Sequence, residues 1–225
     1  MDGTGQLFSP LINTLPNNID YILISLNELQ ASTYLEQAKE ISNLVGDDRL
    51  IIIAESYSGN IAYMLSKILN DQVLKIIFIA SFLSAPIRLI KITSVIPTWF
   101  MNHKFIPDYI LNYFCFSGYG NAEHVKMVRN SIEQVAPKTL KQRVKNMNNI
   151  KSTKQQLNTE VIYIQPTQDR LVNSRAFKNL VNMCTNIKIH NVAGGHFIAQ
   201  TNPSGCANVI LMETACHLTN ALKPH

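Results

Sequence analysis

Short apolar runs alternate along the chain with stretches in which apolar residues recur at the spacing of an α-helix. Five runs are short and apolar enough to be buried strands: residues 21–26, 50–54, 74–82, 161–165 and 187–192. Helical spacing predicts helices over residues 33–46, 60–70, 174–184 and from Asn202 onward. Apolar strands separated by helices favour a parallel sheet with helices on both faces, so the predicted fold class is α/β.

Local signals predict where two helices begin. Thr33 and Glu36 have the spacing of a capping box, in which each side chain accepts a hydrogen bond from the other residue's backbone N–H. Gly46 stands where the end of that helix favours a residue with left-handed backbone. Pro203 suits the first turn of the last helix, because that position needs no N–H donor.

The segment 86–156 interrupts this alternation. It contains no clear strand, and its residues favour helices. Its first part is rich in aromatic residues: Trp99, Phe100, Phe105, Tyr109, Tyr113, Phe114 and Phe116. These residues suit an apolar pocket, and they suit equally the segment's own core. The pattern therefore predicts a core formed by residues 1–85 and 157–225, with a helical insertion formed by residues 86–156.

Positive charge is concentrated in this insertion. From Arg88 to Lys154 there are 11 basic and three acidic residues, whereas the rest of the chain has nine basic and 12 acidic residues. Most charge runs are simply solvated helix faces. The alternative is an electrostatic platform for an acidic partner, with Lys141, Arg143 and Lys145 close together in it. No nucleic-acid-binding module accompanies the charge, so we expect no nucleic-acid partner.

Composition narrows the class of protein. With 225 residues, 46% of them hydrophobic and 16% charged, the chain can fill a sizeable core and is not expected to be disordered. No apolar run reaches the roughly 18 residues of a transmembrane segment, and the first residues do not resemble a signal peptide. The four cysteines, Cys115, Cys184, Cys206 and Cys216, show no metal-ligand spacing, which favours reduced thiols in a cytoplasmic protein.

A serine at a sharp turn is the first candidate for chemistry. Residues 51–60 predict a strand, a tight turn and a helix, with Ser56 at the turn and the small residues Ala54 and Ser58 on either side of it. A strained turn needs small neighbours, and it exposes the serine hydroxyl at a helix N-terminus, where developing negative charge is stabilised. The simpler alternative is a serine that only caps the helix.

Two further candidates follow strands nearer the end of the chain. Asp169 follows the strand at 161–165, and His196 follows Ala193-Gly194-Gly195 after the strand at 187–192. The carboxyl ends of parallel strands meet at one edge of a sheet, where open α/β sheets place their sites. A nucleophilic serine needs a base and a group that orients the base. Taken one at a time, Asp169 is equally a turn residue and His196 a surface-loop histidine.

At these three places the chain resembles the α/β-hydrolase superfamily. Ala54-Glu55-Ser56-Tyr57-Ser58-Gly59 is similar to the nucleophile elbow, residues 168–172 to the acid loop, and Gly195-His196-Phe197 to the histidine loop. The resemblance implies an α/β-hydrolase fold in which the insertion is a helical cap. It also implies that Ser56 is the nucleophile, His196 the base and Asp169 the acid, with no metal and no organic cofactor.

The start of the chain departs from the superfamily's pattern. The family sheet has eight strands in the order 1-2-4-3-5-6-7-8, and this chain would supply strands 4 to 8, the first of them at residues 21–26. Strand 3 would lie before Met1, so we expect the numbered chain to be incomplete. The resemblance implies an oxyanion hole made by the backbone N–H of Tyr57 and a second donor near Met1 or Asp2.

The predicted function is hydrolysis of a carboxylic ester or thioester through an acyl-enzyme on Ser56. The acyl group is expected on a small molecule or on an acidic acyl carrier protein, because a related group of esterases acts on such carriers. The alternative is a truncated, non-catalytic fold that serves as a binding module. A further hypothesis is association of the aromatic and basic insertion with a membrane surface.

Overall fold

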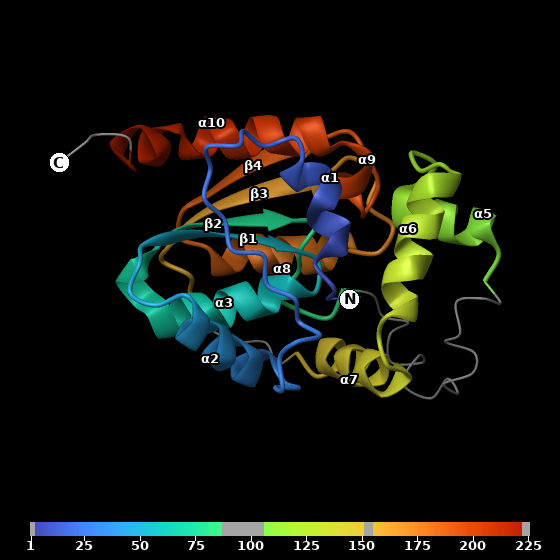
Figure 1. Cartoon of the computed structure of the whole chain (residues 1–225), viewed down its shortest axis with the longest axis horizontal. Coiled ribbons are helices and arrows are strands. Elements are labelled where there is room, and N and C mark those ends of the chain that lie inside the picture. Colours follow the sequence, from blue (N-terminus) through green and yellow to red (C-terminus); the bar gives the residue numbers. More distant parts are fainter. Residues whose placement is uncertain (1–2, 87–105, 151–154, 222–225) are drawn as a thin grey trace.

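A parallel sheet lies at the centre of the computed structural model, which describes residues 3–86, 106–150 and 155–221 (Figure 1). Its strands follow one another across the sheet in chain order: β1 (Leu50–Glu55), β2 (Val73–Ile79), β3 (Glu160–Pro166) and β4 (Ile187–Val192). Each neighbouring pair is parallel. The predicted parallel sheet is confirmed, and so are four of the five predicted strands.

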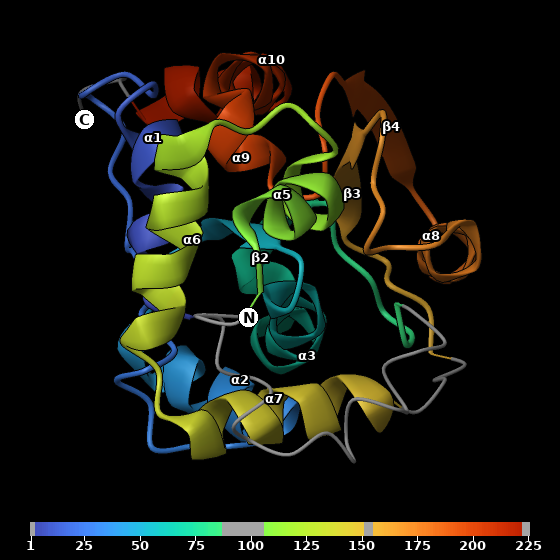
Figure 2. The ribbon, with the colours of Figure 1, turned by 90° about the vertical axis from the view of Figure 1, so that its right-hand side faces the viewer.

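Helices cover both faces of the sheet (Figures 1 and 2). One face packs against α2 (Tyr34–Leu44), α3 (Ser58–Leu69) and α8 (Ser174–Met183). The other packs against α1 (Ser9–Ile12), α9 (Ile198–Thr201) and α10 (Pro203–Ala221). Two short 3-10 helices, η1 (Gln6–Phe8) and η2 (Asn70–Gln72), precede α1 and β2. The pattern predicted α2, α3, α8 and α10 but not the short helices α1 and α9.

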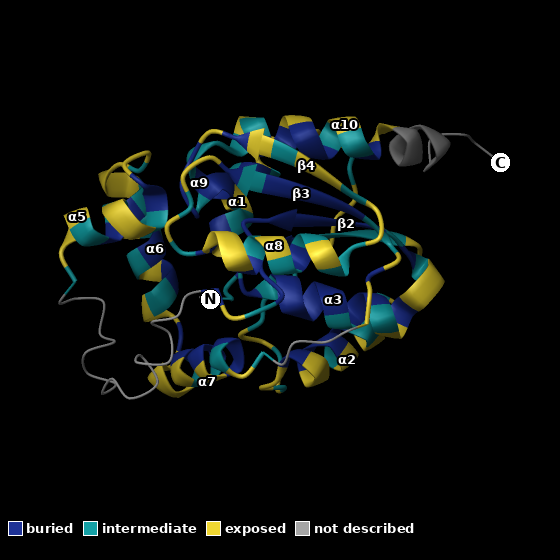
Figure 3. Ribbon diagram, turned by 180° about the vertical axis from the view of Figure 1, so that it is seen from behind, coloured by how far each residue is buried: buried dark blue, intermediate teal, exposed yellow. Residues whose placement is uncertain are grey.

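The two central strands are mostly apolar, apart from polar residues near their ends, because both of their faces are covered (Figure 3). Successive side chains of a strand point to opposite faces of the sheet. Ile77 packs among α1, α9 and α10, while its neighbour Phe78 packs among α2, α3 and α8, and both are fully buried. Burial on both sides therefore explains the continuous apolar runs from which the strands were predicted.

The predicted strand at residues 21–26 is wrong. The segment is irregular, and Tyr21, Ile22 and Leu23 are exposed, whereas Ile24 and Leu26 pack partly against the core on the α2 side. A strand forms only where a neighbouring strand supplies its ladder of hydrogen bonds. Among the described residues this segment pairs with no strand, and the sheet ends at β1. An apolar run alone does not reveal whether such a partner is present.

The described part of the insertion is helical and contains no strand. It comprises α5 (Asp108–Leu111), the π-helix η4 (Asn112–Phe116), α6 (Ala122–Glu133) and α7 (Pro137–Asn148). These helices lie beyond the carboxyl ends of the strands (Figures 1 and 2). Trp99, Phe100 and Phe105 lie outside the described residues. Of the other predicted aromatic residues, Phe116 is fully buried in a small core with Leu7, Leu111, Val125 and Val128, whereas Tyr109, Tyr113 and Phe114 are exposed.

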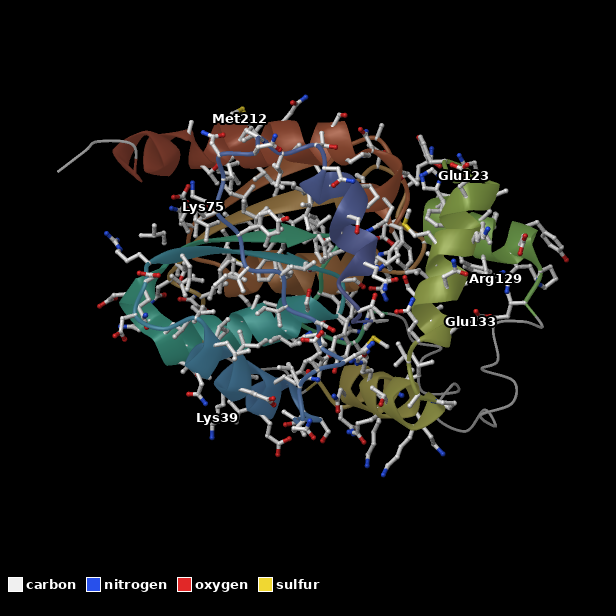
Figure 4. The ribbon with its side chains drawn as sticks, viewed as in Figure 1. Lys39, Lys75, Glu123, Arg129, Glu133 and Met212 are labelled. Carbon is white, nitrogen blue, oxygen red and sulfur yellow. The ribbon has the colours of Figure 1, made fainter. Side chains whose placement is uncertain are left out.

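The basic residues of the insertion divide into exposed and buried ones. On α7, Lys138, Lys141 and Lys145 are exposed, but the side chain of Arg143 is buried, with 1% of its surface accessible. The prediction that Arg143 belongs to an exposed basic platform is therefore wrong. On α6, Arg129 is paired with Asp108 of α5 at 2.5 Å, and Glu123 and Glu133 carry opposite charge on the same helix (Figure 4). Lys126 is also exposed on α6, but most of the exposed lysines of the described insertion lie on α7.

An ionic cluster lies at the other end of the sheet, where β2 and β3 begin. Lys75, labelled in Figure 4, is buried and lies 3.3 Å from the Glu160 carboxylate, while its Nζ donates to the backbone carbonyl of Glu213 at 2.5 Å. Glu213 also pairs with Lys188 at 2.9 Å. These contacts join β2, β3 and β4 to α10. In the described residues no helix, α10 included, is long and apolar enough to cross a membrane.

The capping box predicts a measurable loss of stability when it is removed. The Glu36 N–H donates to Thr33 Oγ1 at 3.3 Å, and the Thr33 N–H donates to Glu36 Oε2 at 3.2 Å, as predicted from the sequence. Thr33→Ala should lower the free energy of unfolding by about 1 kcal/mol, because it removes an acceptor for an orphan N–H. Urea unfolding measures this, and Thr33→Ser should retain most of the stability. An alanine variant as stable as the parent would contradict the capping role.

Candidate active site

Ser56 occupies the tight turn between β1 and α3. Its backbone is left-handed, with φ at 53°, a conformation that residues other than glycine rarely adopt. The Ser56 N–H donates to the carbonyl of Ile79, at the end of β2, over 2.9 Å. A strained backbone of this kind persists only where its surroundings hold it. The turn predicted from the small residues around Ser56 is therefore present.

The loop that follows β2 packs beneath this turn. A Cβ atom on Gly59 would lie 2.8 Å from the Cβ of Ser81, so no larger residue fits at Gly59 without movement. The Ser81 hydroxyl donates to the carbonyl of Ala54 at 2.8 Å, directly before the turn. The small residues Gly59 and Ser81 let the start of α3 and the loop after β2 approach closely. This packing fixes the position of the turn that carries Ser56.

Asp169 lies in the loop after β3, with its carboxylate held by the backbone. Oδ1 accepts hydrogen bonds from the N–H groups of Leu171 at 2.8 Å and Val172 at 2.9 Å. Burial disfavours the charged carboxylate, but attraction to His196, the hydrogen bond with it and the two amides outweigh burial and lower the Asp169 pKa. Ionised Asp169 therefore stabilises the folded state above the ordinary pKa of an aspartate, and this contribution is lost as pH falls through the lowered pKa.

His196 joins the other two side chains. Its Nδ1 lies 2.9 Å from Asp169 Oδ2, and its Nε2 lies 2.8 Å from Ser56 Oγ. Only 4% of His196 is exposed to solvent. The structure thus brings together the three residues that the sequence singled out, from loops after β1, β3 and β4, in one continuous series of hydrogen-bond distances.

The insertion holds the histidine loop in place. A Cβ atom on Gly195 would lie 2.4 Å from the backbone carbonyl carbon of Phe116, so the π-helix η4 packs directly on the chain before His196. The Phe197 N–H donates to the carbonyl of Cys115 at 3.0 Å. The Ser117 hydroxyl donates to the carbonyl of Gln168, next to Asp169. Both the histidine and the acid loop therefore rest on one short segment of the insertion.

Of the predicted oxyanion donors, only Tyr57 is described. It stands between Ser56 and the first residue of α3, and its side chain is buried, with 1% of its surface exposed. Burial raises the pKa of the Tyr57 hydroxyl, and Asn146 and Arg143 oppose that rise. Met1 and Asp2 lie outside the described residues.

Sequence reasoning missed two polar residues that brace the turn. The Gln200 side chain is buried on α9, and its Nε2 donates to Glu55 Oε2 at 3.0 Å and to the Leu7 carbonyl at 2.8 Å. This contact joins the residue before Ser56, the helix after His196 and the start of the chain. The three segments are far apart in the sequence, and no spacing rule connects them.

The described residues hold no cluster of histidine, cysteine, aspartate and glutamate side chains that could bind a metal ion.

An open hollow of about 330 Å³ lies between the π-helix and the acid loop. It is lined by Tyr109, Asn112, Tyr113, Ser117, Gly118 and Arg170. In it the Arg170 guanidinium stacks over the Tyr113 ring at 3.7 Å and donates to the Tyr113 carbonyl at 2.9 Å.

Comparison with known proteins gives a likeness in structure. No protein-family model and no curated protein sequence matches the chain. An esterase from Thermogutta terrifontis superposes with a TM-score of 0.78 at 11% identity, covering 94% of this chain and 85% of that one. A hydrolase from Oleispira antarctica superposes with a TM-score of 0.74 at 14% identity, covering 94% and 87%. The epoxide hydrolase CorEH gives a TM-score of 0.74 at 15% identity, also covering 94% and 87%.

The chain has the α/β-hydrolase fold. This confirms the fold that the resemblance implied. The α/β-hydrolase fold places the turn after β1 and the loops after β3 and β4 at one edge of the sheet, where Ser56, Asp169 and His196 lie. Likenesses at 11–15% identity establish the fold and leave the substrate open.

Close packing under the turn gives a prediction in which the usual effect of a substitution is reversed. Gly→Ala inside a helix ordinarily stabilises a protein by about 0.5–1 kcal/mol. Gly59→Ala should instead destabilise by about 1–3 kcal/mol, because the new methyl group overlaps Ser81. Thermal unfolding of Gly59→Ala, Ser81→Gly and the double variant measures both the loss and its relief. The double variant should lose less stability than Gly59→Ala and Ser81→Gly lose together. Losses that simply add would contradict the packing account.

Proposed function

We propose that the protein is a serine hydrolase that cleaves a carboxylic ester or thioester. The observation that carries this proposal is the series Asp169–His196–Ser56, with distances of 2.9 and 2.8 Å, which ends at a serine in left-handed backbone. A buried base within hydrogen-bond distance of a hydroxyl, itself oriented by a carboxylate, is the arrangement that activates a weak nucleophile.

In the proposed reaction the Ser56 oxygen attacks the carbonyl carbon of the substrate while its proton passes to His196 Nε2. Asp169 accepts the Nδ1–H hydrogen bond and stabilises the imidazolium that forms. His196 then gives the proton to the leaving alcohol or thiol, and the acyl group stays on Ser56. Water attacks this acyl-enzyme in the same way, with His196 again as the base, and releases the acid.

Negative charge that develops on the carbonyl oxygen needs donors. We assign the first to the backbone N–H of Tyr57, at the N-terminal end of α3, where the helix dipole also favours negative charge. A second donor is expected from Met1 or Asp2. A strained turn and a buried carboxylate are costly to keep in a fold that serves only for binding, which favours catalysis over the non-catalytic alternative.

Covalent labelling tests the nucleophile. A fluorophosphonate probe reacts with an activated serine, so the wild-type protein should be labelled on the peptide that contains Ser56. Ser56→Ala should abolish the labelling without unfolding the protein. Ser58→Ala is the matched control: the Ser58 hydroxyl donates to the carbonyl of Glu55 at 2.8 Å, and this variant should still be labelled on Ser56. Label that persists on another serine of the Ser56→Ala variant would refute the assignment.

The roles of His196 and Asp169 predict large losses of rate. His196→Ala should lower kcat by roughly 10²–10⁴, the contribution of general base catalysis. Asp169→Asn should also cut the rate severely, because the amide no longer holds the imidazole with Nε2 free to accept a proton. Hydrolysis of p-nitrophenyl esters measures both, with circular dichroism to show that the variants are folded. Full activity of either variant would remove that residue from the mechanism.

Exposed charge on α7 leads us to propose an acyl carrier protein as a source of substrate. Lys138, Lys141 and Lys145 form an exposed basic row, and steering by exposed charge is screened over about 8–10 Å near physiological ionic strength. With a carrier-linked ester, kcat/KM should fall as salt rises. It should also fall when these three lysines are replaced by glutamate. The kcat/KM for a small neutral ester should change little in either experiment. Lys39→Glu, on α2, tests whether charge elsewhere has the same effect. A flat salt response would leave the lysines as solubilising residues only.

A further inference from the structure

A buried polar network joins helix α7 of the insertion to the residue beside Ser56. Asn146 uses its whole amide in it: Nδ2 donates to the Tyr57 hydroxyl at 2.9 Å and to the Ser32 carbonyl at 2.7 Å, and Oδ1 accepts from Gln142 at 2.9 Å. The Tyr57 hydroxyl also lies 3.5 Å from Gln37 Oε1 on α2. The Tyr57 side chain is thus held from two helices that belong to different parts of the fold.

Arg143, one turn earlier on α7, reaches a second segment near Ser56. Its buried guanidinium lies 6.0 Å from the centre of the Tyr57 ring and donates to Asn27 Oδ1 at 2.9 Å. It also lies against Gly3, where a Cβ atom would come within 2.7–2.8 Å of the guanidinium atoms. The Asn27 N–H donates to the Gly3 carbonyl at 3.3 Å. Arg143 therefore supports the loop at Gly3 both directly and through Asn27.

These contacts end on the two segments to which the oxyanion donors are assigned. The Tyr57 side chain is attached to the backbone whose N–H is the first donor, and Gly3 directly follows Met1 and Asp2, where the second is expected. The Tyr34 ring, 4.8 Å from that of Tyr57, packs the same side chain from α2. A network that served only to hold α7 on the core would not need to converge on these two segments.

We propose that Asn146 and Arg143 are positioning residues for the oxyanion donors, so that the reactivity of Ser56 depends on the polar contacts that α7 makes with Tyr57 and with the loop at Gly3. This inference rests on the proposed function. Neither residue touches the reacting atoms. Asn146 fixes the Tyr57 side chain, and through it the orientation of the Tyr57 N–H, while Arg143 fixes the loop at Gly3. Misplacement of a catalytic group by about 1 Å can cost on the order of 10² in rate.

A double-mutant cycle separates positioning from stability. Asn146→Leu and Tyr57→Phe each break the Asn146–Tyr57 hydrogen bond, and the double variant removes both buried partners, which leaves no unpaired polar atom at that bond. Each single variant should lower kcat of the folded protein about 10-fold or more with KM nearly unchanged, since the donors act mainly in the transition state. The double variant should be no slower than the slower single variant.

Val144→Ala is the matched control. Val144 is buried on the same helix and packs in the hydrophobic core, so its truncation removes apolar packing without touching the polar network. The thermal midpoint should fall for Val144→Ala, while kcat per folded molecule stays close to that of the wild type. Arg143→Met should lower kcat, and Arg143→Lys should recover part of it.

Labelling by the fluorophosphonate probe keeps the two proposals distinguishable. Wild type labelled on Ser56, with slower labelling of Asn146→Leu and Tyr57→Phe than of Val144→Ala, supports positioning. Equal labelling rates and equal kcat for all of these variants would overturn the positioning role and leave the hydrolase proposal intact. A wild-type protein that is not labelled at all would overturn both.

Discussion

The arrangement of the candidate site depends on one constraint, that both ring nitrogens of His196 have a partner within 2.9 Å at the same time. Ser56 and Asp169 come from loops that are 113 positions apart in the chain, and His196 from a third loop. Only a parallel sheet in a fixed register brings the ends of β1, β3 and β4 to a common edge. Close packing of β2 and β3 side chains on both faces favours that register, because a shift by one residue would exchange the side chains packed on one face with those packed on the other.

The insertion takes part in building the site as well as lying over it. The π-helix η4 packs on Gly195 so closely that no side chain fits there, and its Cys115 carbonyl accepts the Phe197 N–H. Helix α7 reaches the other side of Ser56 through Tyr57. Segments of the insertion thus contact residues adjacent to both His196 and Ser56. Pi-helical turns inside helices occur frequently at functional sites, and here the turn presents the carbonyl that anchors the histidine loop.

Much of this fold, and the choice of Ser56, Asp169 and His196 as residues that the structure brings together at the candidate site, could be predicted from the sequence because their signals are local. The turn at Ser56 needs small residues within a few positions, and the capping box at Thr33 spans three. The interpretation of residues 21–26 as a strand failed because strand formation depends on a neighbouring strand, which the run itself does not specify. Glu55 and Gln200 were missed for the same reason, since their contact joins distant segments.

The helical spacing of α7 already indicates that Arg143 is buried. It lies on the same face of α7 as Leu140, Val144 and Met147, three or four positions apart, and all of them are buried. A count of basic residues along the insertion does not distinguish Arg143 from the exposed lysines. Its place in the helical pattern instead predicts a buried side chain, and a buried guanidinium needs partners close by, which Asn27 and the Tyr57 ring supply.

The central claim is that Ser56 forms a covalent acyl intermediate. Acid quenching during turnover of p-nitrophenyl acetate, followed by peptide mass spectrometry, tests it most directly. The account predicts one acetyl group on the peptide that contains Ser56, accumulating in step with a burst of p-nitrophenol. Turnover with no acetyl group on Ser56, or with acetylation at another residue that accounts for the burst, would contradict it.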